Sequence, residues 1–181
     1  LRYFNELNPS PANQKLVKAF LKEYSAQGKA IRTQAAYLRS LVELLKFRNK
    51  DLDKFTKKDM LEFCDAFQKG KNGSRVVKDT KARIKTFFKW ANGGEEYPDC
   101  VRWIKYNGRE KSRKLPKDML AVKDIISLIK ATNNVRDKAV AAVLYESASR
   151  PEEFMRLKLR DVNFDKYGAT IVVDGKTGMR R

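Results

Sequence analysis

Four basic side chains in one segment of the sequence could bind a row of phosphate groups. If residues 74–91 form an α-helix, these side chains fall within about 80° of one another. Apolar residues such as Val77 and Ile84 then lie on roughly the opposite side, where they can face a core. The stripe includes no acidic residue, whereas a face that is only solvated usually mixes both signs of charge; a solvated basic face stays the alternative. The four residues are Arg75, Lys78, Lys85 and Lys89.

The composition of the whole chain favours the same kind of partner. The 181 residues include 40 Lys and Arg against 22 Asp and Glu, which gives a formal net charge of +18. Self-repulsion makes such a charge unfavourable unless a polyanion offsets it, so nucleic acid is the first candidate. A membrane surface is a weaker candidate, because no apolar run approaches the ~20 residues that span a bilayer. Residues 1–91 carry 21 Lys and Arg against 9 Asp and Glu, and we expect this half to make most of the DNA contacts.

Several kinds of catalytic site are excluded within these residues. The sequence contains no His, which excludes Ser-His-Asp and Cys-His catalysis and most zinc sites. The two thiols, Cys64 and Cys100, are far apart in the sequence, and we interpret them as buried structural thiols in a reducing cytoplasm. The glycines match neither a phosphate-binding loop nor a dinucleotide-binding pattern. We therefore expect neither a metal nor a cofactor.

The elements that must position the basic stripe are helices. Residues 1–91 predict a helical domain, because apolar residues recur at helical spacing between turn signals. Ser10 and Thr56 are suitable capping residues for the first and third helices, and Gly70 to Ser74 separate the third from the fourth. The four helices are expected at about 11–28, 32–48, 57–69 and 74–91.

A different organisation is expected after residue 91. We interpret residues 92–115 as a basic linker, because they combine Gly93-Gly94 and Pro98 with a run of cations. The aromatic residues of this stretch could dock part of it on a neighbouring domain. Residues 116–181 predict a second domain, in which helices precede a β-branched strand and a hairpin turn. The helices are expected at about 121–131, 134–147 and 151–158, the strand at 169–173 and the turn at 174–178.

The second domain resembles a known family. The segment from Asp137 to Phe154 is similar to the first conserved box of the tyrosine recombinases, the phage and plasmid integrases. In that box an apolar helix and a small-residue turn precede Arg-x-x-Glu, here Arg150 and Glu153. The following Leu157-Lys158-Leu159-Arg160-Asp161-Val162 resembles the family's Leu-x-x-x-Asp-Ile/Val stretch.

The resemblance continues to the end of the sequence. Gly175-Lys176-Thr177-Gly178 is similar to the β-hairpin that carries the family's catalytic lysine. The wider pattern, which begins at Tyr167-Gly168-Ala169, is most similar to archaeal recombinases and to integrases of archaeal viruses or plasmids. The first 91 residues are similar to the family's helical core-binding domain, with Ser74 at the start of the basic fourth helix.

The resemblance implies a mainly α fold: a four-helix, SAM-like core-binding domain followed by an incomplete α+β catalytic domain with a β-hairpin. It implies site-specific recombination through a 3′-phosphotyrosine intermediate, in which Arg150 stabilises charge on the phosphorus centre and Lys176 protonates the leaving oxygen. Glu153 is expected to support Arg150. The expected partner is double-stranded DNA, with assembly into a tetramer near the nucleoid. The residues expected to contact DNA are Arg32, Thr33, Arg39, Ser74, Arg75, Lys78, Lys85 and Lys89.

The resemblance also leaves alternatives open. None of the seven tyrosines matches the place of the family's nucleophile, which is expected beyond Arg181 together with the later conserved boxes. We therefore expect residues 1–181 alone not to cleave DNA. One alternative is a DNA-binding protein without enzymatic activity, either a regulator or a decayed recombinase. A more distant alternative is an RNA-binding helical protein.

Overall fold

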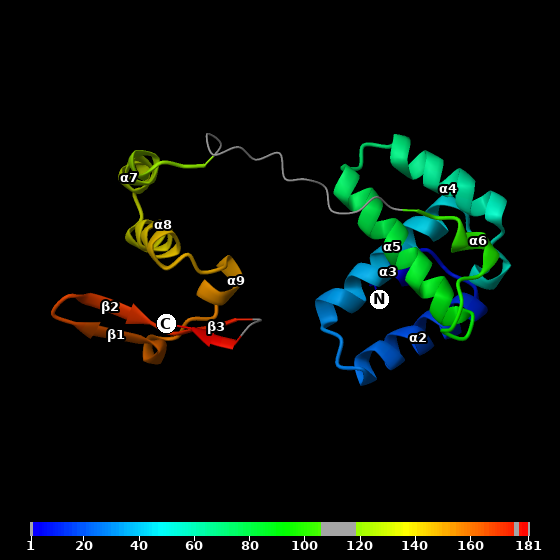
Figure 1. The fold of residues 1–181 in the computed structure, drawn as a ribbon, viewed down its shortest axis with the longest axis horizontal. Coiled ribbons are helices and arrows are strands. Elements are labelled where there is room, and N and C mark those ends of the chain that lie inside the picture. Colours follow the sequence, from blue (N-terminus) through cyan, green and yellow to red (C-terminus); the bar gives the residue numbers. More distant parts are fainter. Residues whose placement is uncertain (1, 106–118, 176–177, 181) are drawn as a thin grey trace. The chain divides into compact units, whose positions relative to one another are not determined.

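The computed structural model describes residues 2–105, 119–175 and 178–180 (Figure 1). Contacts divide the chain into two compact units, Leu1–Glu110 and Lys111–Arg181. The described part of the first unit is helical, and the second unit joins helices to two β-hairpins. The mainly α fold class predicted from the sequence is therefore confirmed.

The long helices of the first unit begin where the sequence predicts. Ser10 Oγ accepts a hydrogen bond from the main-chain N–H of Asn13, and Pro11 occupies the first helical position. Thr56 and Asp59 form a capping box, because Thr56 Oγ1 accepts from the Asp59 N–H while Asp59 Oδ2 accepts from the Thr56 N–H. The elements of this unit are α1 (Arg2–Asn5), α2 (Pro11–Ala26), α3 (Ile31–Phe47), η1 (Leu52–Lys54), α4 (Lys57–Lys69), α5 (Ser74–Ala91) and α6 (Asp99–Arg102).

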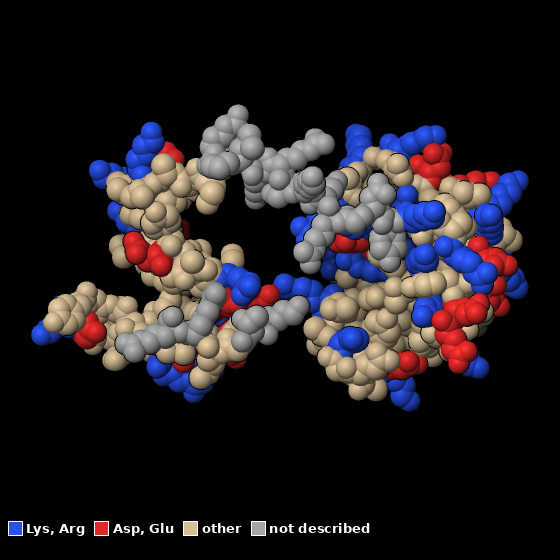
Figure 2. Space-filling view, viewed as in Figure 1, with Lys and Arg blue, Asp and Glu red and all other residues tan. Residues whose placement is uncertain are grey.

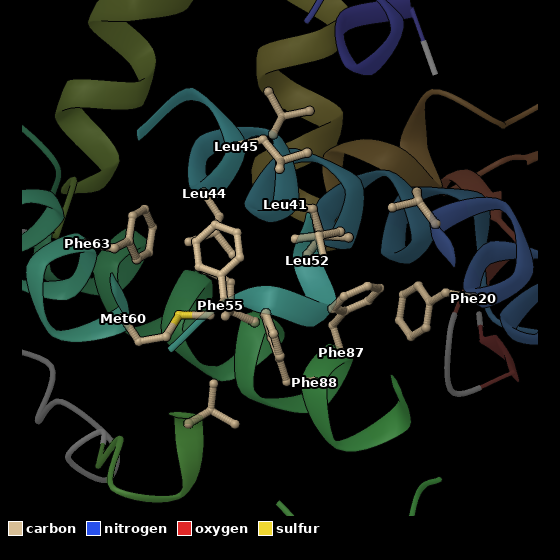
Figure 3. Close-up of a cluster of buried hydrophobic side chains, with 14 of the residues drawn as sticks. Phe20, Leu41, Leu44, Leu45, Leu52, Phe55, Met60, Phe63, Phe87 and Phe88 are labelled. Atoms are coloured by element: carbon tan, nitrogen blue, oxygen red, sulfur yellow. The ribbon is translucent and has the colours of Figure 1, made fainter. Parts of the chain in front are cut away.

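These helices enclose one hydrophobic core, shown in Figure 3. Phe20 of α2, Leu41 and Leu44 of α3, Phe63 of α4 and Phe87 of α5 are each at most 1% exposed. The rings of Phe20 and Phe87 meet edge to face, with their centres 5.1 Å apart. Burial of a side chain of this size stabilises a fold by roughly 1.5–3 kcal/mol. The core therefore holds α5 by its apolar face, as the sequence pattern predicts.

The first unit does not end at residue 91, where the sequence predicts the start of a linker. α6 packs against α4 and α5, and it follows a turn in which Gly93 and Gly94 have φ values of +87° and +86°. Val101 and Ile104 are at most 2% exposed and belong to the core. Because these side chains are buried with the helices, residues 92–105 belong to the first unit. The rest of the predicted linker, residues 106–115, lies outside the described residues.

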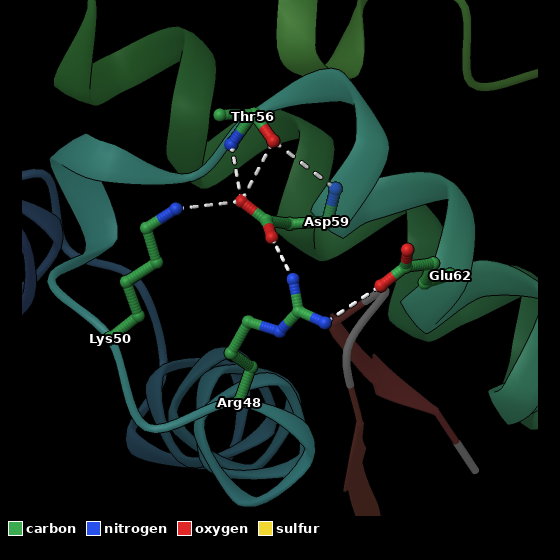
Figure 4. Close-up of polar contacts among 5 residues, drawn as sticks. All are labelled: Arg48, Lys50, Thr56, Asp59 and Glu62. Atoms are coloured by element: carbon green, nitrogen blue, oxygen red, sulfur yellow. Dashed lines mark hydrogen bonds and ion pairs between the residues drawn. The ribbon is translucent and has the colours of Figure 1, made fainter.

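A polar network holds the loop between α3 and α4 (Figure 4). The buried carboxylate of Asp59 accepts hydrogen bonds from the Lys50 ammonium (2.9 Å) and the Arg48 guanidinium, in addition to the Thr56 capping contacts. Arg48 also pairs with Glu62 at 2.7 Å. These donors stabilise the ionised carboxylate, and the bond from Lys50 contributes most to holding the pKa of Asp59 well below its usual range. The network therefore ties residues 48–56 to the first turns of α4.

The second unit contains two antiparallel hairpins next to its helices. β1 pairs with β2 in the register Val162↔Ile171, and β3 pairs with β4 in the register Gly175↔Gly178. Among the described residues of this unit, Val173 is the one buried hydrophobic residue, at 5% exposure. The elements are α7 (Val122–Ala131), α8 (Val135–Ser147), α9 (Pro151–Phe154), η3 (Leu159–Asp161), β1 (Val162–Asp165), β2 (Gly168–Ile171), β3 (Val173–Gly175) and β4 (Gly178–Arg180).

Two predicted elements of the second unit differ from the structure. The single strand expected at residues 169–173 is divided between β2, which pairs with β1, and β3, which pairs with β4. The helix expected at residues 151–158 ends at Phe154 and is followed by a 3-10 turn. Asp161 caps that turn by accepting a hydrogen bond from the Lys158 N–H.

Candidate nucleic-acid interface and active site

Helix α5 carries all four cations of the predicted basic stripe, but the two ends of the stripe have different surroundings. At the start of the helix, Ser74 and Arg75 are exposed and Lys78 is half-buried. At its end, Lys85 and Lys89 are half-buried next to the segment that continues into α6. The four cations predicted as one surface therefore do not have equal access to a ligand.

Lys85 is occupied by contacts within the first unit. Its ammonium donates to the carbonyl oxygens of Ile104 (2.9 Å) and Arg102 (3.3 Å), which lie at the end of α6. The ring of Tyr97 adds cation–π contacts, with its centre 4.6 Å from Lys85 Nζ and 5.2 Å from Lys89 Nζ. No sequence pattern indicated this role for Lys85, although the aromatic residues of the predicted linker suggested that part of it docks on a neighbouring domain.

The segment that holds these lysines also brings negative charge. Glu95, Glu96 and Asp99 follow α5 directly, and Arg102 pairs with the last two of them. In the view of Figure 2, Lys and Arg are spread over the first unit, whereas acidic groups gather mainly toward its right-hand margin. Nearby carboxylates lower the attraction for phosphate, so the end of α5 is a poorer anion site than its start.

The start of α3 offers further exposed groups. Arg32 and Thr33 lie in its first turn and Arg39 lies two turns further on, and all three are exposed. α3 packs against α5, and Figure 1 shows that both helices begin on the left-hand side of the first unit. The first turns of two helices, each with a positive dipole end, therefore lie at one side of the unit together with basic side chains.

In the second unit, Arg150 and Glu153 form a compact pair at the start of α9. The main-chain N–H of Arg150 donates to Glu153 Oε2 (3.0 Å), and its guanidinium donates to Oε1 (2.8 Å). The side chain of Glu153 is 6% exposed and that of Arg150 is 61% exposed. Ala148, with φ +47°, ends α8 in the left-handed region and sets the tight turn before Arg150. The buried carboxylate of Glu153 therefore holds a guanidinium that is exposed to solvent.

The hairpin of β3 and β4 meets this pair through Gly175. A side-chain carbon placed on Gly175 would lie 3.0 Å from the carboxyl carbon of Glu153 and closer still to its Oε1. The last residue of β3 is thus in direct contact with the carboxylate that holds Arg150. Lys176 follows Gly175 in the sequence but lies outside the described residues.

Other kinds of site find no support in the described parts of the chain. Over residues 2–105, 119–175 and 178–180, no three acidic or thiol side chains are grouped so that they could hold a metal ion. The described helices include none with the length and apolar character needed to cross a membrane. Burial raises the pKa of the Cys64 and Cys100 thiols, which fits their interpretation as structural groups.

Residues 16–96 match the family described as phage integrase, N-terminal SAM-like domain. The tyrosine recombinases named below are similar over about 70% of the chain. These matches support a place for the chain in the tyrosine recombinase and integrase family. The family match includes every residue expected to contact DNA and ends before Arg150. The predicted four-helix, SAM-like organisation of the first unit is therefore confirmed.

Two proteins similar to this chain are named tyrosine recombinases. A tyrosine recombinase XerA of Pyrococcus horikoshii is 28% identical over 129 residues, which are 70% of this chain and 41% of the relative. A tyrosine recombinase of Thermosipho africanus is 27% identical over 141 residues, which are 73% of this chain and 49% of the relative. The chain thus spans less than half the length of these curated relatives.

Proposed function

We propose that this chain is the DNA-binding and phosphate-binding part of an enzyme that carries out site-specific DNA recombination. Strands are broken and rejoined through a 3′-phosphotyrosine intermediate, without metal or cofactor. The observation that carries the proposal is the Arg150–Glu153 pair, which exposes a guanidinium while its carboxylate contacts Gly175. A guanidinium is always charged and presents a planar fork to two oxygens of one phosphate.

DNA binding is the task of the first unit. The groups at the starts of α3 and α5 bind the phosphates of one duplex, led by the exposed Arg32, Thr33 and Arg75 and the half-buried Lys78. Ser74 and Arg39 lie next to them on the same two helices, whereas Lys85 and Lys89 act mainly through the packing of residues 92–105. Binding by phosphate contacts falls steeply as the salt concentration rises.

Cleavage requires a hydroxyl nucleophile, stabilisation of negative charge and a proton for the leaving oxygen. A tyrosine oxygen attacks the phosphorus and the bond from phosphorus to the 5′-oxygen breaks, so that the DNA 3′-phosphate becomes linked to the tyrosine. Arg150 stabilises the charge on the non-bridging oxygens during this step. Lys176 donates a proton to the 5′-oxygen, because an ammonium loses its proton more readily once it is desolvated.

The nucleophile is supplied from outside residues 1–181. Tyr24 is a poor candidate, because burial and its hydrogen bond with Tyr37 raise its pKa. Tyr97 lies between Lys85 and Lys89, and Tyr167 lies in the turn between β1 and β2, away from Arg150 in the sequence. The complete enzyme acts as a tetramer on DNA in the nucleoid region of the cytoplasm.

The experiment that tests this function uses the full protein and a nicked duplex that contains its recombination site. On such a duplex the cleaved fragment diffuses away, so the covalent protein–DNA complex accumulates and can be counted. Arg150→Ala should lower its rate of formation about 10²–10³-fold while duplex binding is unchanged. Arg150→Lys should be nearly as defective, because it keeps the charge but not the planar fork. Covalent complex formed by Arg150→Ala at the wild-type rate would contradict the proposal.

A DNA-binding protein without enzymatic activity is the second candidate. It is favoured by one observation, namely that the family match covers the predicted DNA-binding residues and ends before Arg150. Duplex binding by the wild-type protein with no covalent complex would support this candidate. Tighter binding to RNA than to duplex DNA in a competition would instead favour a role on RNA.

A further inference from the structure

Gly175 occupies a position where space, rather than backbone conformation, demands a glycine. Its φ is not positive, whereas Gly178, its partner across the hairpin, has a φ of +99°. A main-chain conformation of this kind accepts any L-residue. The added carbon of an alanine would nevertheless lie 3.0 Å from the Glu153 carboxyl carbon. The Glu153 carboxylate therefore fills the place that a side chain would take.

Glu153 has little freedom to move away. Its two oxygens accept hydrogen bonds from the main chain and the guanidinium of Arg150, and its side chain is 6% exposed. A displaced carboxylate would lose these contacts in a buried position, which is unfavourable. A side chain at Gly175 would consequently shift the carboxylate and, with it, the Arg150 guanidinium.

Capping of the helix alone does not require a glutamate at this position. Asp59, Asp124 and Asp161 each accept the equivalent N-terminal main-chain hydrogen bond, at 2.8–2.9 Å. Glu153 makes the same bond with a side chain that is one methylene longer. That additional length, roughly 1.5 Å, carries the carboxylate outward to the Arg150 guanidinium and to Gly175.

We propose that Gly175 is a positioning residue: its missing side chain lets the Arg150–Glu153 pair lie directly against the end of β3. The pair and the end of β3 are thereby held in direct contact, which keeps the Arg150 guanidinium in place for the phosphate that it binds. This role rests on the proposed function of Arg150. Gly175 touches no substrate atom and acts only through Glu153 and Arg150.

The test is a double-variant cycle in the full protein, with single-turnover formation of the covalent complex as the readout. Gly175→Ala should slow this step by about 10²-fold, because a displacement of about 1 Å at a reacting group has an effect of that size. Glu153→Asp shortens the side chain and opens space, so the double variant should be faster than Gly175→Ala alone. Effects that multiply within about twofold would show independence and overturn the proposal.

Gly178→Ala is the matched control in the same hairpin. It strains a backbone with φ +99° but meets no atom within 4 Å, so its defect should not be relieved by Glu153→Asp. Relief of both glycine variants by Glu153→Asp would mean that the hairpin as a whole had been restored. That outcome would also contradict a specific contact at Gly175.

A second readout does not depend on cleavage. In NMR spectra of the 181-residue chain, the Arg150 main-chain N–H signals should shift in Gly175→Ala and move back toward wild type in the double variant, because an aspartate also accepts this main-chain hydrogen bond. Unmoved Arg150 signals in Gly175→Ala would overturn the positioning role. If these signals behave as expected but the wild-type full protein forms no covalent complex, the contact stands and the proposed function fails.

Discussion

The ammonium of Lys85 lies 2.9 Å from the carbonyl oxygen of Ile104 and 4.6 Å from the centre of the Tyr97 ring. A residue that the helical pattern assigns to a DNA-binding stripe thus holds the end of α6 against α5. This contact commits the end of the stripe to the fold, whereas Arg75 at its start is exposed. This difference has consequences for both DNA binding and stability.

The two ends of the stripe should differ in their effect on DNA binding. Arg75→Ala/Lys78→Ala should weaken duplex binding and reduce the slope of log affinity against log salt by about 2, because each lost phosphate contact removes about 0.9. Filter binding at several salt concentrations measures this slope. The control is Lys57→Ala/Lys58→Ala, which removes the same charge from exposed residues at the start of α4. An equal change of slope in the control would show that net charge, and not this surface, governs binding.

Lys85 should matter for the stability of the first unit. Lys85→Met removes two hydrogen bonds to carbonyl oxygens and a cation–π contact, so the free energy of unfolding should fall by about 1–2 kcal/mol. Urea unfolding followed by Trp fluorescence reports on this unit, because both tryptophans, Trp90 and Trp103, belong to it. Lys89→Met loses only the contact with the Tyr97 ring, so its free energy of unfolding should fall by about 0.5 kcal/mol. Equal losses of stability in the two variants would contradict the role of Lys85 in holding the end of α6 against α5.

Asp59 should make stability depend on pH in acid. Its pKa in the folded protein lies below the unfolded value of about 3.9, so its ionised form stabilises the fold above about pH 4. This contribution is lost progressively as the pH falls through the range between the two values. Asp59→Asn should therefore lower the free energy of unfolding by about 1–3 kcal/mol at pH 7, and the difference from wild type should shrink below about pH 4.

The exposed Asp65 provides the control for this experiment. Its pair with Lys69 has both side chains more than 60% exposed, so Asp65→Asn should change stability by less than about 0.5 kcal/mol at either pH. A difference between wild type and Asp59→Asn that stays constant from pH 7 to pH 3 would argue against ionisation of Asp59 as the cause.

Local signals in the sequence predicted much of the fold. Ser10 and Thr56 cap helices as expected, because capping depends on residues only three positions apart. The two-faced pattern of residues 74–91 likewise predicted which side of α5 faces the core. The residues expected to contact DNA and the Arg-x-x-Glu motif were also predicted from short-range patterns, together with the family resemblance.

Contacts between distant residues account for what the sequence did not predict. Val101 and Ile104 enter the core only because α6 folds back over α5, which the glycines before it did not reveal. Residues 169–173 are divided because they pair with two different strands, β1 and β4. The fit of Gly175 against Glu153 is also a contact across the fold, and no local pattern indicates it.

The central claim is that Arg150 and Lys176 act on different atoms of one phosphate, and substrate rescue tests it most directly. A methylphosphonate at the cleavage site removes the negative charge that Arg150 offsets, and a 5′-bridging sulfur needs no proton from Lys176. In the full protein, we expect the first substrate to restore cleavage by Arg150→Ala only and the second to restore cleavage by Lys176→Ala only. Rescue of neither variant, or of both by one substrate, would contradict this assignment.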